Sequence, residues 1–198
     1  MNRVRELKKI KDEILALSTS PLYKYRVKNN YLPVVGEGSC YSQIMLIGEA
    51  PGKNEALTGL PFCGAAGRVL DQLFVSTGIN RKEVYITSIV KDRPPQNRDP
   101  SPKEIRIYGE FLDRQIEIIR PKVIGTLGRH AMSYVMKKFG LDTQLEPIGK
   151  AHGKIYSAQA SYGPIHIVAL YHPSVALYSR KQITVLNQDF KILKKYGK

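Results

Sequence analysis

At 198 residues with 42% hydrophobic content, the chain can form one covered core but is short for two, so we expect a single domain over residues 1–198. The net charge of +14 favours a polyanionic partner, and nucleic acid is the leading candidate. The alternative is that the lysines only make the surface soluble. Two cysteines, Cys40 and Cys63, are too few for a disulfide framework or a four-thiolate cluster. The charged first residues and the lack of a long apolar run predict a cytoplasmic protein without a membrane anchor.

The first half of the chain predicts a helix, a connector and a strand–loop–helix unit. Apolar residues at helical intervals predict an amphipathic helix over about 3–17, and tyrosines with turn-forming residues predict an extended connector over 23–41. The apolar run 44–47 is typical of a strand covered on both faces, and apolar spacing predicts a helix between Gly64 and Gly78. The loop between them follows the carboxyl end of a strand, where open α/β sheets bind ligands.

The second half predicts a further alternation of strands and helices. We expect strands over 84–90, 123–127, 148–157 and 165–170, and a stiff basic loop over 91–100. Helices are expected over 101–120, where Ser101 and Glu104 form a capping box, over 128–139, and through 183–193. This order predicts the α/β class: a three-layer α/β/α sandwich with a central, mainly parallel sheet.

Four motifs carry the functional signal. They are Gly48-Glu49-Ala50-Pro51-Gly52, LPFCGAAG at 60–67, RPPQNRDPSP at 93–102, and His172-Pro173-Ser174. The first has neither the spacing nor the Ser or Thr of a phosphate-binding P-loop, and no Rossmann glycine pattern is present. The combination closely resembles family 4 of the uracil-DNA glycosylase superfamily, from about Leu17 to Lys195. The resemblance implies the glycosylase fold and hydrolysis of the N-glycosidic bond of deoxyuridine in DNA.

The resemblance also implies roles for individual residues. His172 would donate a hydrogen bond to the departing base, Glu49 would orient the attacking water or support the cationic sugar, and the flipped base would stack on Phe62. Further base-binding candidates are Gly48, Ala50, Pro51, Gly52 and Ser88. Candidates for contact with uracil-containing DNA are Lys53, Gly64, Lys91, Arg93, Arg98, Ser174, Val175, Ala176, Leu177 and Arg180, with residues 175–177 as possible apolar wedges.

Two departures from the family pattern stand out. The family typically holds a four-iron, four-sulfur cluster on four cysteines, whose matching positions here are Leu17, Ser20, Asp92 and Tyr108. None supplies a soft thiolate, so we expect no metal and no cofactor, with packing in place of ligation. Leu17 would extend the apolar stripe of the first helix, Tyr108 would fill volume on the helix over 101–120, and Asp92 would pair with a neighbouring basic residue.

The second departure is Ser88, which stands where the family usually has an asparagine that reads the uracil edge. A hydroxyl cannot make both amide contacts, so uracil is the expected substrate and hypoxanthine or xanthine are alternatives. The alternative from another functional class is a protein of the same fold that binds DNA or uracil but does not catalyse a reaction. We expect a monomeric, monofunctional enzyme.

Overall fold

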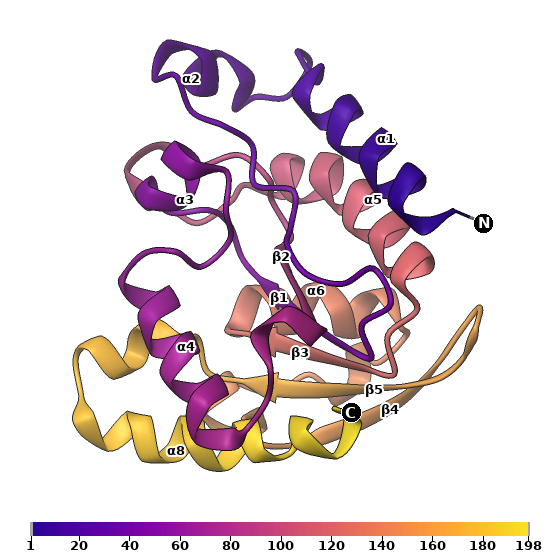
Figure 1. Ribbon diagram of the computed structural model, residues 1–198, viewed down its shortest axis with the longest axis vertical. Coiled ribbons are helices and arrows are strands. Elements are labelled where there is room, and N and C mark those ends of the chain that lie inside the picture. The colour runs from indigo at the N-terminus through magenta and orange to yellow at the C-terminus, as the bar shows by residue number, and fades with distance from the viewer. Residues whose placement is uncertain (1, 198) are drawn as a thin grey trace.

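The computed structural model describes residues 2–197, apart from the side chain of Arg180, and centres on a five-stranded sheet (Figure 1). The strands are β1 (Ile44–Gly48), β2 (Val84–Ser88), β3 (Val123–Leu127), β4 (Ile155–Ala160) and β5 (Gly163–Leu170), in the order β2-β1-β3-β5-β4. β1 pairs in parallel with β2 and β3, and β3 pairs in parallel with β5, whereas β4 is antiparallel to β5. The four parallel strands therefore end at one edge of the sheet.

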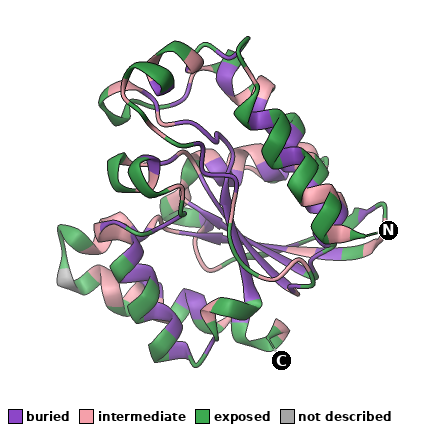
Figure 2. Cartoon of the chain, turned by 45° about the horizontal axis from the view of Figure 1, so that its top comes forward, coloured by how far each residue is buried: buried purple, intermediate pink, exposed green. Residues whose placement is uncertain are grey.

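Helices cover both faces of the sheet (Figures 1 and 2). On one face, α1 (Arg3–Leu15), α5 (Pro102–Ile119) and α6 (Arg129–Lys138) form a buried cluster with Met45 and Ile47 of β1. On the other face, α4 (Ala65–Thr77) and α8 (Arg180–Lys191) pack with Ile44 and Leu46 of the same strand. Because successive strand residues point to opposite faces, a continuous apolar run fits a sheet that is covered twice. The predicted three-layer α/β/α sandwich is confirmed.

Two predicted helix boundaries follow from local chemistry. At the start of α5, the Ser101 hydroxyl accepts from the Glu104 amide at 3.3 Å, and the Glu104 carboxylate accepts from the Ser101 amide at 2.8 Å. α4 begins after Gly64 and ends at Gly78, which has the left-handed φ of 68° that favours glycine.

Three segments differ from the sequence predictions. The predicted connector contains a short helix, α2 (Tyr23–Lys28), and the loop after β1 contains α3 (Lys53–Thr58). The predicted strand over 148–157 begins instead as α7 (Ile148–Ala151), and β4 follows it. In runs this short, periodicity does not distinguish a helical turn from a strand, which explains the error.

The remaining helical elements are single short turns. They are η1 (Arg81–Glu83), η2 (Pro95–Asn97), η3 (Asp142–Gln144), η4 (Pro173–Leu177) and η5 (Leu193–Tyr196). Within residues 2–197, no helix combines the length and the apolar character that crossing a bilayer requires.

Candidate functional site

The carboxyl edge of the parallel strands brings the main candidates to one side of the molecule. Glu49 directly follows β1, Ser88 ends β2, and His172 lies two residues beyond β5. A cavity of about 530 Å³ lies elsewhere, lined by Ser42, Ile44, Val84 and others near the amino ends of the strands. The candidate residues therefore occupy a different part of the fold from this cavity.

Phe62 joins this group through the loop between α3 and α4. A Cβ atom added to Gly48 would lie 2.9 Å from Phe62 Cζ and 3.2 Å from Ser88 Oγ. The Phe62 ring also faces the His172 imidazole, with the centroids 5.7 Å apart and the planes tilted by 35°. Phe62 thus contacts both the ends of β1 and β2 and the His172 loop, which links four predicted residues from four separate segments.

The backbone around Phe62 explains the glycines of its motif. Phe62 adopts a left-handed φ of 51°, and a Cβ at Gly67 would lie only 1.9 Å from the Phe62 carbonyl oxygen. Any side chain at position 67 would therefore force this carbonyl and α4 apart, which ties the ring position to the start of the helix.

His172 is held as a neutral hydrogen-bond donor. Its Nδ1 accepts from the Ser174 amide at 3.2 Å and lies 2.8 Å from the Ser174 hydroxyl. Burial lowers the pKa of His172 to about 4, so the ring is uncharged at neutral pH. A neutral ring whose Nδ1 is an acceptor carries its proton on Nε2, which is then free to donate to a ligand.

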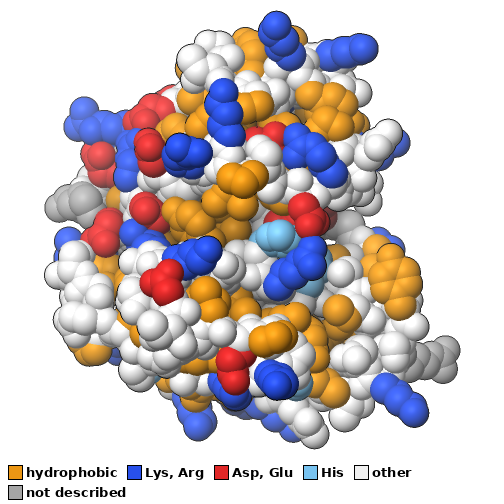
Figure 3. Space-filling view, turned by 180° about the vertical axis from the view of Figure 1, so that it is seen from behind, with side chains coloured by type: hydrophobic (Ala, Val, Ile, Leu, Met, Phe, Trp, Pro, Cys, Tyr) orange, Lys and Arg blue, Asp and Glu red, His pale blue; other side chains and the backbone are white. Residues whose placement is uncertain are grey.

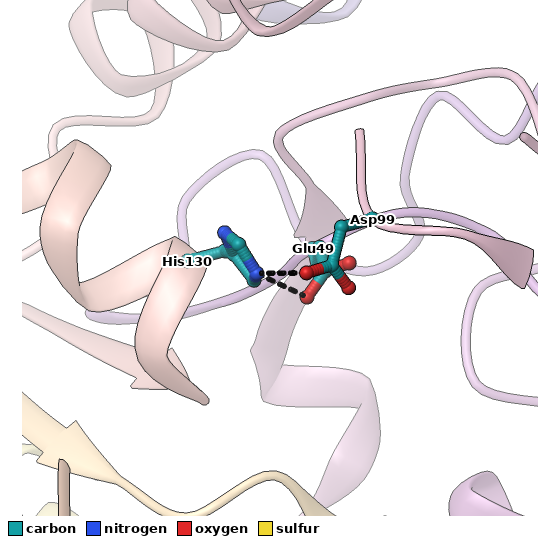
Figure 4. Close-up of side chains that lie close together, drawn as sticks. All are labelled: Glu49, Asp99 and His130. Carbon is teal, nitrogen blue, oxygen red and sulfur yellow. Dashed lines mark hydrogen bonds and ion pairs between the residues drawn. The ribbon is translucent and has the colours of Figure 1, made fainter. Parts of the chain in front are cut away.

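Glu49 belongs to a group of charged side chains that Figure 4 shows in close-up. His130 Nε2, from α6, lies 3.8 Å from the Glu49 carboxylate and 3.1 Å from that of Asp99, which also accepts from Arg129 at 2.7 Å. Burial raises the pKa of Glu49, the charge of His130 opposes this, and Asp99 adds to it. In the sequence, the signal that points to His130 is its position just after β3, at the same sheet edge.

Glu55 is a second residue that the sequence analysis missed. Its Oε1 accepts from the amides of Cys63 and Gly64 at 3.0 and 2.8 Å, and a Cβ at Gly52 would lie 2.6 Å from its Oε2. Gly52 and Gly64, predicted as base- and DNA-contacting residues, therefore have a structural role in the loop that carries Phe62. The acidic first turn of α3 is the signal that points to Glu55.

The model of the Uracil DNA glycosylase superfamily matches residues 35–193, which include every candidate from Gly48 to Arg180. The chain belongs to the uracil-DNA glycosylase superfamily. A type-4 uracil-DNA glycosylase of Saccharolobus solfataricus is 44% identical over 186 residues, which cover 93% of this chain and 83% of the relative. One of Archaeoglobus fulgidus is 40% identical over 179 residues, 90% and 87% of the two chains. A type-5 enzyme of Pyrobaculum aerophilum is 28% identical over 184 residues, 85% and 77% of the two chains. The resemblance inferred from the motifs is confirmed.

Three of the four positions that match the family's cluster cysteines, Ser20, Asp92 and Tyr108, form a hydrogen-bonded network instead. The Tyr108 hydroxyl donates to Asp92 at 2.6 Å and lies 2.7 Å from the Ser20 hydroxyl, while Arg26 pairs with Asp92 at 3.2 Å. Burial raises the pKa of Asp92, and the hydrogen bonds from Tyr108 and Arg26 oppose this. Leu17, the fourth position, packs against the cluster of α1, α5 and α6. Two hydroxyls, an alkyl chain and a carboxylate already bound by arginine do not fit an iron–sulfur cluster.

The basic side chains predicted to contact DNA differ in whether other protein groups already bind them. Lys53 is exposed at the start of α3, whereas Arg93 donates to Asn97 and to the Tyr31 hydroxyl, both at 2.8 Å. The Arg98 guanidinium is occupied by Glu104, at 2.6 and 2.8 Å. Lys and Arg side chains are spread over the face in Figure 3 rather than gathered in one patch. The prediction for Arg180 falls on a side chain outside the described part of the chain.

Lys91 is a correction to the sequence analysis. Its side chain is 0% exposed, so it cannot contact a phosphate, and the prediction of a DNA contact is wrong. The backbone beyond β2 stays inside the fold because the amides of Ile89 and Val90 donate to the carbonyls of Gly48 and Glu49 at 2.9 and 3.0 Å. Lys91 follows these residues directly and turns inward.

The remaining candidates lie in or beside the same loops. Ala50 packs on the cluster of α1, α5 and α6, and Pro51 is buried. In η4, Val175 and Ala176 pack against the cluster of α4 and α8, whereas Leu177 is 46% exposed. The neighbouring Tyr178 is 89% exposed, which identifies residues 177 and 178 as the apolar tip of this loop.

Proposed function

We propose that this chain is a DNA glycosylase that hydrolyses the N-glycosidic bond of a deaminated base, most favourably uracil, and leaves an abasic site in DNA. The arrangement of Phe62 and His172 around Gly48 and Ser88 carries this proposal, and the names of the relatives support it. The proposal treats residues 1–198 as one domain that acts as a monomer. A cytoplasmic location is a further part of the proposal.

Base binding follows from the shape of the site. A base within a duplex cannot reach a pocket, so the nucleotide must first leave the stack. Stacking of the extruded base on Phe62 would contribute about 1–3 kcal/mol. Because Gly48 has no side chain, the Phe62 ring and the Ser88 hydroxyl can lie close to the end of β1, and the base would bind beside them.

The reaction itself is a hydrolysis. When the bond from C1′ to the base nitrogen breaks, the electron pair stays on the base and the sugar becomes cationic. His172 Nε2–H would donate to the anionic O2 of the base, and the Glu49 carboxylate would stabilise the cationic sugar and orient a water molecule. The water oxygen then bonds to C1′, and the proton that it loses is balanced by the proton that the free base takes up.

Ser88 is the residue that most affects which base the site selects. It offers one hydroxyl at the base edge, which can donate once and accept, whereas an amide presents a donor and an acceptor together. We propose that uracil is still the preferred base, and that discrimination against hypoxanthine and xanthine is the property most affected by Ser88.

A single assay tests the function and separates it from binding alone. Labelled DNA that carries one uracil, hypoxanthine, xanthine or mismatched thymine is incubated with the protein, and abasic sites are then cleaved with alkali. We expect strand breaks at uracil first. Binding of uracil-containing DNA without any breaks would favour the non-catalytic alternative and overturn the proposal.

A further inference from the structure

Lys91 lies fully inside the fold, directly behind the base site. Its Nζ donates to the Thr87 hydroxyl, the Ser88 carbonyl and the Gln115 side-chain oxygen, each at 2.6 Å. All three partners are neutral oxygens, so the lysine is held without a carboxylate among its hydrogen-bond partners. An uncompensated buried charge is costly, and such groups are retained mainly where they serve a function.

The partners of Lys91 determine its protonation state. The Thr87 hydroxyl donates to the Val35 carbonyl at 2.7 Å, and the Gln115 amide nitrogen donates to Val35 and to the Tyr85 hydroxyl, at 2.9 and 3.1 Å. With these protons committed, all three groups around Nζ can only accept. A neutral amine would direct its lone pair at one of these oxygens, whereas an ammonium satisfies all three. Burial lowers the pKa of Lys91 well below the usual value for lysine. Hydrogen bonds to three groups that can only accept favour the charged form, and this geometry is the ground for treating Nζ as an ammonium.

Ser88 connects this ammonium to the base site. Its carbonyl oxygen accepts from Lys91, and its hydroxyl lies toward Gly48, 3.2 Å from where a Cβ at that residue would be. The same residue therefore touches the ammonium on one side and faces the base on the other.

We propose that Lys91 is a positioning residue that acts through Ser88: it fixes the end of β2 and places a buried positive charge behind the departing base. This inference rests on the proposed glycosylase function. The base leaves with negative charge, and a fixed positive charge in a water-excluded site favours that charge more in the transition state than in the bound substrate. Lys91 would complement the hydrogen bond from His172 on the other side of the pocket.

The test compares two leaving groups. The fluorine of 5-fluorouracil withdraws electrons, so this base carries negative charge more readily than uracil and depends less on help from the protein. Single-turnover excision of each base is measured for the wild type, for Lys91→Met, and for Lys137→Met, which removes an exposed lysine on α6. We expect Lys91→Met to slow uracil excision about 10-fold more than 5-fluorouracil excision, below the loss of about 100-fold or more for a donor in direct contact. Lys137→Met should leave both rates unchanged.

A second variant covers the case in which Lys91→Met does not fold, as judged by near-ultraviolet circular dichroism. Gln115→Glu keeps an oxygen beside Nζ but adds a negative charge that cancels the ammonium, so the same unequal losses are expected. Equal losses on both bases would show that Lys91 only supports the strand, and unchanged rates would show that it has no part in excision; either result overturns the inference. If the wild type excised neither base, the proposed function itself would fail, which is a distinct outcome.

Discussion

The rings of Phe62 and His172 lie side by side with their centroids 5.7 Å apart, although the two residues come from different loops. The Ser174 amide donates to His172 Nδ1, which leaves Nε2–H free to donate to a ligand. We predict that His172→Ala lowers the single-turnover rate of uracil excision by about 100- to 1000-fold, the usual cost of removing one preorganised donor. His166→Ala, which changes a histidine of β5 outside the site, is the matched control. Full activity in His172→Ala would show that the imidazole is not the donor.

The carboxylate of Glu49 should control the acid limb of the pH–rate profile. Burial raises its pKa above the ordinary 4.5, so the active carboxylate is lost as the pH falls through this raised value. His130 opposes the shift, and therefore His130→Gln should move the acid limb to higher pH. Glu49→Gln should lower the rate and remove this limb. Profiles measured between pH 4 and pH 8 check both expectations, and an acid limb that stays in place in His130→Gln would argue against the contact between His130 and Glu49.

The half-buried imidazole of His172 also predicts a pH dependence of stability. Its pKa falls from 6.5 to about 4 on folding, so between these values the unfolded chain binds the proton more readily. Stability should therefore rise with pH across this window, by about 3 kcal/mol for this group alone. Urea unfolding at a series of pH values checks the slope, and His172→Gln should reduce it. An unchanged slope in that variant would mean that the ring is solvated.

The sequence predicts the frame of the fold better than the site. β1, β2 and β3 are buried at every residue, which agrees with the apolar run 44–47 and with the apolar and β-branched residues that fill most of β2 and β3. The direction of Lys91 was not predictable, because it depends on hydrogen bonds between the end of β2 and the end of β1. His130 was missed for a similar reason: its link to Glu49 exists only once β1 and β3 lie side by side.

The positions that match the cluster cysteines were predicted in part from the sequence. The sequence predicted that Asp92 would pair with a basic residue and that Tyr108 would fill buried volume, and the structure agrees with both. It did not identify Arg26 as the partner, because this residue lies in a segment that was predicted as an irregular connector and forms α2 instead.

The exposed tip of η4 should matter more for duplex than for single-stranded DNA. Leu177 and Tyr178 present apolar surface beside His172, and a wedge is needed only where a flipped base leaves a hole in a stack. We predict that the double variant Leu177→Ala, Tyr178→Ala slows excision from duplex DNA several-fold more than from single strands. Val75→Ala, which changes an exposed apolar residue on α4, is the control. Equal losses on both substrates would exclude the wedge role.

The buried pair of Arg26 and Asp92 should contribute strongly to stability, since it joins α2 to the loop after β2 and, through Tyr108, to α5. Removing one member of a buried pair leaves the other charge unpaired and typically costs about 3–5 kcal/mol. We therefore predict that Arg26→Met lowers the free energy of unfolding by this amount, measured by urea denaturation. Arg114→Ala, which breaks an exposed pair with Glu13, should cost about 1 kcal/mol or less.

A double variant separates the cost of the unpaired charge from that of lost packing. Replacing both members by apolar residues, as in Arg26→Met with Asp92→Leu, leaves no buried charge and should recover much of the stability lost in Arg26→Met. The hydroxyl of Tyr108 then loses its acceptor but keeps the contact with Ser20, so the recovery should be incomplete. If Arg26→Met costs no more than Arg114→Ala, the buried network does not hold these segments together, and the apolar contacts around Leu17 must do so instead.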